Sequence, residues 1–229
     1  MINYIFPHPK RVKYHIPLSE LKKISNAGAY ATDLYVYAER FNKIGNQDPY
    51  VWNEQFLNTY CKKPWNRKNW EKVDKIFWIS KLNDSFVCDL VFVVKKGSIH
   101  QWDEYNKIER NHPMIDSGFA YKDHYCWPER GEHVFNCKVK RVTLKADMET
   151  SFQPQIADGK LVDVTDILKK EWIEKLNRRS YGNNIIRIDQ ESADMLYKSI
   201  IEKSGSYAIK GNQLAPVRSI MKPEYEMSW

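Results

Sequence analysis

The sequence predicts an α+β fold, in which a mixed, partly closed β-sheet with inserted helices follows a helical, basic N-terminal region. Three observations lead to this prediction. Segments with the apolar period of a helix crowd the first third of the chain, β-branched and aromatic runs begin at Lys75, and strand-helix pairs close the chain. We expect one domain, comprising a helical basic region over 1–74, a mixed-sheet core over 75–209 and a C-terminal tail over 210–229.

Three helices are expected in the N-terminal region. The segments 18–28, 32–45 and 50–61 each repeat apolar residues three or four positions apart. Ser19 is a candidate N-cap of the first helix, and Gly28 is a candidate stop. Such helices would bury one apolar stripe and leave the basic residues exposed.

The core begins with two apolar runs, KIFWIS and FVCDLVFVV, separated by KLND. They predict a β-hairpin over 75–94. A short helix over 101–110 follows, and then a strand over 133–144, whose alternation shifts at Arg141. A β-bulge at that point would restore the register.

The C-terminal part predicts strand-helix pairs over 160–176 and 183–205. In the last helix Asp189 is the expected N-cap and Gly205 the expected stop. From Lys210 onward we expect a loosely held tail.

The composition is typical of a soluble globular chain, with 42% hydrophobic and 28% charged residues. The mean hydropathy is -0.65, and no apolar run approaches the ~20 residues of a membrane helix. Prolines and charges interrupt the N-terminal stretch MINYIFPHPKRVKYH, so we expect no export and a cytoplasmic location. In that reducing compartment the four cysteines are expected to be thiols. They are Cys61, Cys88, Cys126 and Cys137.

The charge is unevenly placed. The formal net charge is +7, and residues 1–75 hold 13 basic and 7 acidic side chains, together with 13 aromatic ones. Lys and Arg neutralise phosphates, and flat rings stack on exposed bases, so this combination favours nucleic acid, DNA or RNA, as the partner. Basic proteins without such a partner and aromatic residues buried in cores provide the alternative explanation.

The order of the hairpin, the helix near Trp102, the strand ending at Leu144 and the closing strand and helix resembles the PUA-like group of small β-barrels. This group includes the EVE, ASCH and YTH domains, and the resemblance covers about residues 75–205. It implies a partly closed barrel that reads RNA, or a modified base, by holding a flipped base in an aromatic pocket.

A pocket of that kind has candidates in the loop between Gly97 and His133. Ring faces hold a flipped base, and polar groups bond to its edge. The candidate ligand-binding residues are Trp102, Tyr105, Tyr121, Asp123, Tyr125 and Trp127. The alternative is that these rings only fill one end of the sheet.

Three segments are candidates for contacts with nucleic acid. Each combines basic residues with aromatic rings or lies next to the expected pocket or a glycine turn. They comprise Lys62, Lys63, Trp65, Arg67, Lys68 and Trp70; Lys138, Lys140 and Arg141; and Arg178 and Arg179. A solvated loop anchored by its Trp residues, or a helix cap, would explain the first and third segments equally well.

The main alternative function is a metal-dependent nuclease, in which carboxylates hold Mg²⁺ and a Lys stabilises the attacking water. Its candidate residues are Asp89, Asp116, Asp123, His124 and Lys138. The Glu-x-Lys expected on the second strand is replaced by Asn136, Cys137 and Lys138, so we rank the nuclease second. An interaction protein whose aromatic residues are all core is a third alternative.

A zinc site is not expected. His124, Cys126, His133 and Cys137 lie close together, but their spacing is irregular, whereas structural zinc sites use paired short spacings. We therefore predict neither a metal nor a cofactor.

Overall fold

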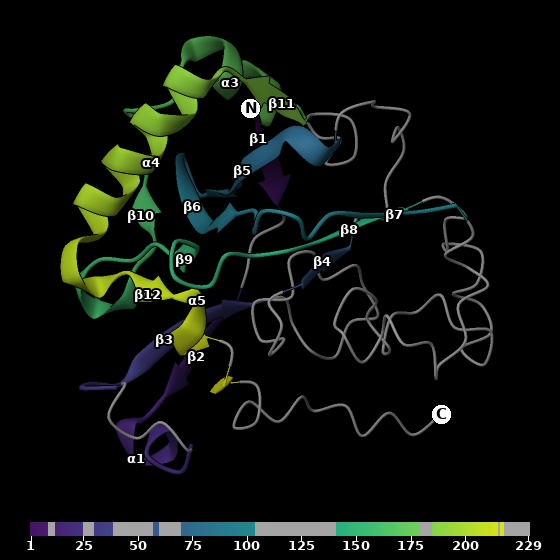
Figure 1. Cartoon of the computed structure of the whole chain (residues 1–229). Helices are drawn as coiled ribbons and strands as arrows, with labels where there is room; N and C mark the ends of the chain where they lie inside the picture. Colours follow the sequence, from purple (N-terminus) through teal and green to yellow (C-terminus); the bar gives the residue numbers. More distant parts are fainter. Residues whose placement is uncertain are drawn as a thin grey trace, which may run out of the picture.

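The structure is a computed structural model that describes residues 1–8, 12–24, 30–38, 57–59, 70–103, 141–178, 185–214 and 216–217. Figure 1 shows the arrangement of its elements. In chain order they are β1 (Ile2–His8), β2 (Val12–Ile16), α1 (Leu18–Leu21), β3 (Leu34–Ala38), β4 (Leu57–Thr59), η2 (Trp70–Lys72), β5 (Val73–Leu82), β6 (Ser85–Val93), β7 (His100–Trp102), β8 (Arg141–Lys145), β9 (Phe152–Gln153), η5 (Ala157–Gly159), β10 (Val162–Asp163), α3 (Lys170–Leu176), β11 (Ile186–Ile188), α4 (Gln190–Ser204), η6 (Gly205–Tyr207), β12 (Ile209–Lys210) and α5 (Gly211–Leu214).

Seven of these strands form the main sheet, in the order β11-β1-β5-β6-β9-β12, with β10 also paired to β6. β1 and β5 run parallel, and the other pairs are antiparallel. The predicted α+β class and mixed sheet are therefore confirmed. Among the described strands β11 and β12 remain edges, so this sheet does not close into a barrel. Because β1 lies between β11 and β5, the N-terminal region contributes a strand to the same sheet.

The predicted hairpin is confirmed as β5 and β6, which pair along their whole length. Asn83 and Asp84 form a two-residue connection between them. Asn83 has a positive φ of 56°, a backbone conformation that Asn adopts at low cost and that two-residue hairpin loops require.

A β-bulge interrupts this hairpin. Trp78 pairs with Leu90, but the next residue, Ile79, pairs with Cys88. Asp89 is therefore the extra residue on β6. On the side of β6 that faces away from β5, the pairing strand also changes at this bulge. β10 pairs with Cys88 before it, and β9 pairs with Val91 after it.

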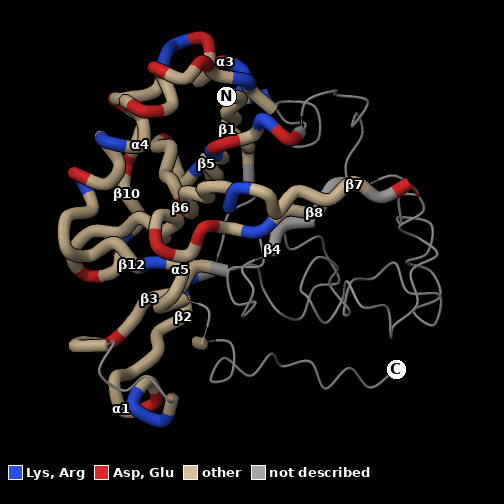
Figure 2. Tube along the Cα trace, in the orientation of Figure 1, with Lys and Arg blue, Asp and Glu red and all other residues tan. Residues whose placement is uncertain are grey.

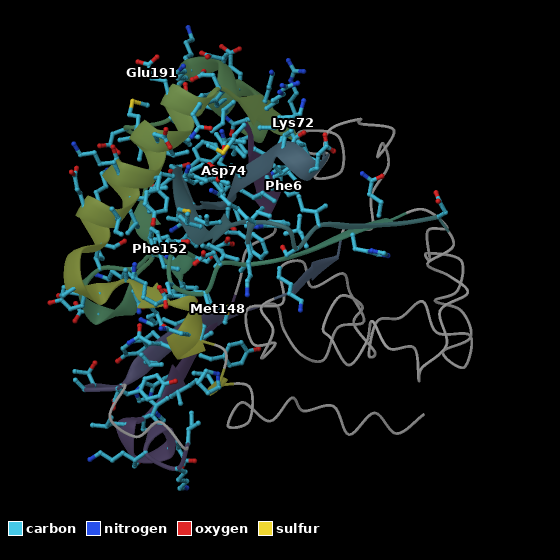
Figure 3. All side chains as sticks on the ribbon, viewed as in Figure 1. Phe6, Lys72, Asp74, Met148, Phe152 and Glu191 are labelled. Carbon is cyan, nitrogen blue, oxygen red and sulfur yellow. The ribbon has the colours of Figure 1, made fainter. Side chains whose placement is uncertain are left out.

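α4 covers one face of the main sheet (Figure 1). Ala193, Leu196 and Ile200 are each 0% exposed and pack against apolar residues of the strands. Phe152 of β9, labelled in Figure 3, lies with its ring 5.6 Å from that of Tyr197. The predicted last helix is confirmed, with Asp189 accepting a hydrogen bond from the Ser192 N–H as its N-cap and Gly205 following its last residue.

The antiparallel pair β2-β3, with α1, covers part of the opposite face. Leu21, Leu34 and Val36 are buried in a cluster with Trp78 and Leu90 of the main sheet. The Gln153 side chain joins the two layers, since its Oε1 accepts from the Tyr37 N–H at 2.9 Å and its Nε2 donates to the Tyr35 carbonyl at 2.8 Å.

The predicted helical N-terminal region is wrong where the structure describes it. Residues 34–38 of the expected second helix form β3, and residues 57–59 of the expected third helix form β4. Leu34 and Val36 are buried while Tyr35 and Tyr37 are less so, which is the alternation of a strand half covered by a core. The first helix begins at Leu18, as expected, but it is only the four-residue α1, and its N-cap position is Pro17 rather than Ser19.

Three further expectations are corrected. Residues 101–102 of the expected helix over 101–110 belong to β7. The expected strand-helix pair over 160–176 is present, but its elements, β10 and α3, are shorter than predicted. The loose tail expected from Lys210 onward is wrong for its first residues, because Gly211, Leu214 and Val217 are buried and the Tyr30 hydroxyl donates to the Gln213 carbonyl at 2.6 Å.

Among the described helices, none is long and apolar enough to cross a lipid bilayer.

Candidate nucleic-acid interface

The three-stranded sheet β4-β8-β7 brings together residues that the sequence assigns to different candidate sets. β8 lies in the centre and pairs antiparallel with both neighbours. Trp102 of β7 stands opposite Arg141 of β8, and His100 stands opposite Thr143. Residues opposite each other in an antiparallel ladder share one face of the sheet. A residue predicted for the aromatic pocket and one predicted for phosphate contact therefore form a single cross-strand pair.

Lys145 is the last residue of β8. Leu144, which precedes it, is 0% exposed and packs in an apolar cluster, so Lys145 lies on the opposite face of the strand. β8 thus ends at a partly buried lysine.

A tight turn positions Lys95 next to Lys145. The Ser98 N–H donates to the Lys95 carbonyl at 3.1 Å, and Gly97 within this turn has a φ of 73°. The Lys95 N–H donates to the Lys145 carbonyl at 2.9 Å. The Ser98 hydroxyl donates to that same carbonyl at 3.2 Å and accepts from the Lys145 N–H at 3.1 Å. These bonds therefore hold the backbones of the two lysines side by side.

The electrostatics agree with this proximity. Burial lowers the pKa of Lys145, and the charge of Lys95 lowers it further. Asp147 lies close enough to be affected by Lys95. Burial would raise the pKa of Asp147, but hydrogen bonds from Thr150 and Glu149 and the charge of Lys95 lower it. Figure 2 shows basic residues on two neighbouring segments, the connection between β6 and β7 and the C-terminal end of β8.

Asp89, the first residue of the nuclease set, is 1% exposed in β6. The Ser80 hydroxyl donates to its Oδ2 at 2.6 Å. Its carboxylate, after burial, also contributes to raising the pKa of the Cys88 thiol. Within the described ranges no group of three or more His, Cys, Asp or Glu side chains could hold a metal ion.

The remaining predicted residues are placed as follows. Arg178 is exposed and follows α3, and α3 lies beside α4 and away from β7 and β8 in Figure 1. Trp70 begins η2. The others lie outside the described residues. They are Lys62, Lys63, Trp65, Arg67, Lys68, Tyr105, Asp116, Tyr121, Asp123, His124, Tyr125, Trp127, Lys138, Lys140 and Arg179.

A second group of cationic and aromatic side chains lies on the β2-β3 pair. The Lys13 Nζ lies 4.1 Å from the centre of the Tyr35 ring, and the His15 ring stacks on Tyr35 at 5.0 Å. These side chains already contact another part of the fold. Lys13 donates to the Asp158 carbonyl at 2.6 Å. The Tyr35 ring lies so close to Gly159 that a Cβ there would come within 2.3 Å of it. This group serves to hold η5, and the β7-β8 face is the stronger candidate.

The sequence reasoning missed Lys95, Lys96 and Lys145. The signals for the first two were present, since a KKG turn after a buried strand exposes both lysines. For Lys145, the alternation in RVTLK puts it on the opposite face of the strand from Leu144. The proximity of Lys95 to Lys145 could not be predicted from the sequence, because it depends on the bridge between Val94 and Ala146.

Comparison with known proteins gives no further assignment. No family model, no curated protein and no solved structure matches this chain.

Proposed function

We propose that this protein binds nucleic acid through the face of the β4-β8-β7 sheet. The observation that carries the proposal is the pairing of Trp102 on β7 with Arg141 on β8, together with Lys145 at the other end of β8, whose carbonyl accepts from the Lys95 N–H. Cations at both ends of an extended strand suit a chain of phosphates, and a Trp on the neighbouring strand suits an unstacked base.

A single strand is the preferred ligand in this proposal. Bases paired in a duplex hide their faces, whereas a single strand or a flipped nucleotide offers them to an aromatic residue. The resemblance of the sequence to the PUA-like group favours the same partner, although β7 replaces the helix expected near Trp102 and the described sheet is open. The pocket formed with Tyr105, Tyr121, Asp123, Tyr125 and Trp127 stays part of the proposal.

The test compares the binding of fluorescent single-stranded, duplex and base-modified oligonucleotides by the full chain, with and without Mg²⁺. A variant carrying Lys95→Gln and Lys145→Gln keeps the aliphatic stems and loses two charges. We expect the slope of log K against log salt to fall by about 0.7 for each lost contact with a single strand.

The matched control carries Lys170→Gln and Lys198→Gln, which remove two exposed charges from α3 and α4. It should keep the slope of the wild type. Equal slopes in all three proteins would remove the β8 face from the interface. Cleavage of the oligonucleotide with Mg²⁺ would favour the nuclease instead.

A further inference from the structure

The turn η5 contains an Asp-Gly pair in an uncommon backbone conformation. Asp158 has a φ of 63° and a ψ of 15°, and Gly159 has a φ of 62°. Glycine adopts a positive φ at little cost, and a larger residue would not fit, because a Cβ at Gly159 would come within 2.3 Å of the Tyr35 ring. Packing against β3 therefore requires a glycine directly after an exposed aspartate.

A glycine in this position has a chemical consequence. It leaves the next peptide nitrogen open to the aspartate side chain, so the Gly159 nitrogen can attack Cγ of Asp158. A C–N bond forms, a C–O bond of the carboxyl group breaks, and the hydroxyl group leaves with the amide proton as water, which gives a succinimide. Hydrolysis at the former main-chain carbonyl takes up one water and gives isoaspartate, in which the main chain runs through Cγ.

The fold holds the peptide unit that has to move in this reaction. Attack on Cγ requires the peptide plane between Asp158 and Gly159 to turn about ψ of Asp158. Both polar ends of that plane are bonded, since its carbonyl accepts from the Lys13 Nζ at 2.6 Å and its N–H donates to the Ile156 carbonyl at 3.1 Å. The following carbonyl, that of Gly159, accepts from the Tyr37 hydroxyl at 2.6 Å.

We infer that Asp158 and Gly159 form a site of isoaspartate formation, which the β2-β3 pair protects. The two protecting donors, Lys13 and Tyr37, stand opposite each other in the β2-β3 ladder, so both act only while η5 lies against that pair. Modification therefore follows local separation of η5 from β2-β3. It also makes the separation lasting, because an isoaspartate main chain is longer by one methylene group and no longer presents the same carbonyls to these donors.

The test measures succinimide formation in the full chain. The protein is incubated at neutral pH in water enriched in a heavy oxygen isotope, which labels each succinimide that hydrolyses, and peptide mapping locates the label. Labelling at Asp158 should be at least about tenfold faster in wild type unfolded in guanidinium chloride than in the folded protein, because the reaction needs an open turn. Lys13→Gln with Tyr37→Phe should accelerate labelling of the folded chain about tenfold, as the loss of two hydrogen bonds implies.

Two variants and an internal reference separate this effect from others. Lys160→Gln removes an exposed charge from the same loop and should keep the rate of the wild type. Lys13→Arg keeps a cationic donor and should stay close to that rate. Asp84, which precedes Ser85 in the β5-β6 turn, is the reference, because global unfolding of a variant would accelerate labelling there as well.

Three results would overturn the inference. An unfolded chain without label at Asp158 would mean that the pair is not a modification site. Equal rates in the folded and unfolded wild type, or in the wild type and the double variant, would mean that the bonds from Lys13 and Tyr37 protect nothing. Equal acceleration at Asp84 and Asp158 in the double variant would assign the effect to global unfolding rather than to the release of η5.

Discussion

The two faces of the main sheet are covered by different kinds of layer. On one face lies α4, and the layer beneath it is largely apolar, with the buried side chain of Asn3 bonded to the Gln190 side chain rather than to the backbone of the helix. On the other face lies the β2-β3 pair, and the layer beneath it contains the side chain of Gln153, which is 0% exposed. The difference follows from how each covering element satisfies its own backbone.

A helix bonds its backbone groups internally, so α4 needs only an apolar stripe to pack on a sheet. An edge strand, in contrast, leaves the backbone groups along its outer side without partners within the sheet. The outer edge of β3 presents the Tyr37 N–H and the Tyr35 carbonyl towards the main sheet, and Gln153 pairs with both. A buried amide thus takes the place of a neighbouring strand.

The second face also holds the buried pair Ser80 and Asp89. Ile79 and Cys88 belong to the cluster under α4, and Ser80 follows Ile79 on the strand, so it faces the opposite way. Asp89 receives its hydrogen bond and lies on the same side. The bulge at Asp89 therefore puts a carboxylate in the face that already tolerates polar groups.

The largest effect is expected on the α4 face. Leu196→Ala should lower the free energy of unfolding by about 2 to 5 kcal/mol, since it removes a fully buried side chain and leaves a cavity. Urea denaturation measures the change. The neighbouring control Met195→Ala, at a side chain 45% exposed, should stay within about 0.5 kcal/mol of the wild type. Equal losses in both variants would mean that α4 does not pack as described.

A smaller and more local effect is expected on the other face. Gln153→Leu would fill a similar volume but leave the Tyr37 N–H and the Tyr35 carbonyl unpaired, which should cost about 1 to 3 kcal/mol. Hydrogen exchange should show lost protection at Tyr37 before any loss in α4. Gln153→Glu keeps the acceptor and should retain part of the protection at Tyr37. Uniform loss across the chain would contradict the picture of two separately covered faces.

The elements that could be predicted from the sequence carry their signals locally. The β5-β6 hairpin has two apolar runs and a two-residue turn, and α4 has its cap, its apolar stripe and its stop within one stretch. The pattern of 32–45 was ambiguous, because Leu34 and Tyr37 fit a helical period while Leu34 and Val36 fit a strand. Pairing with β2 decided it, and such pairing is set by tertiary contacts.

The candidate interface likewise has a part that could be predicted from the sequence and a part that could not. Trp102 and Arg141 could be chosen by residue type, but their pairing across β7 and β8 spans a long separation in sequence. Lys145 could also be chosen by residue type, but its place next to Lys95 could not, since that depends on the hydrogen bond between their backbones. Residue chemistry is local, whereas the neighbourhood that gives it a function is made by the sheet.

The smallest expected effect concerns the start of α4 and depends on pH. The Asp189 carboxylate accepts from the Ser192 N–H and hydroxyl, and these bonds, with the charge of Lys169, hold its pKa below the ordinary value of 3.8 although burial opposes them. A pKa lowered by folding stabilises the protein above the unfolded value, and that contribution is lost as the pH falls through the folded one.

Asp189→Asn tests this, because Asn also caps helices but does not titrate here. Urea midpoints measured between pH 7 and about pH 3 should show the wild type more stable at neutral pH, with the difference closing below about pH 4. Glu191→Gln removes a carboxylate from the same turn without removing the cap, and so separates the effect of the bonds to Ser192 from that of the helix dipole. A difference between wild type and Asp189→Asn that stays constant with pH would show that the charge of Asp189 contributes nothing, and that α4 is held by its apolar stripe alone.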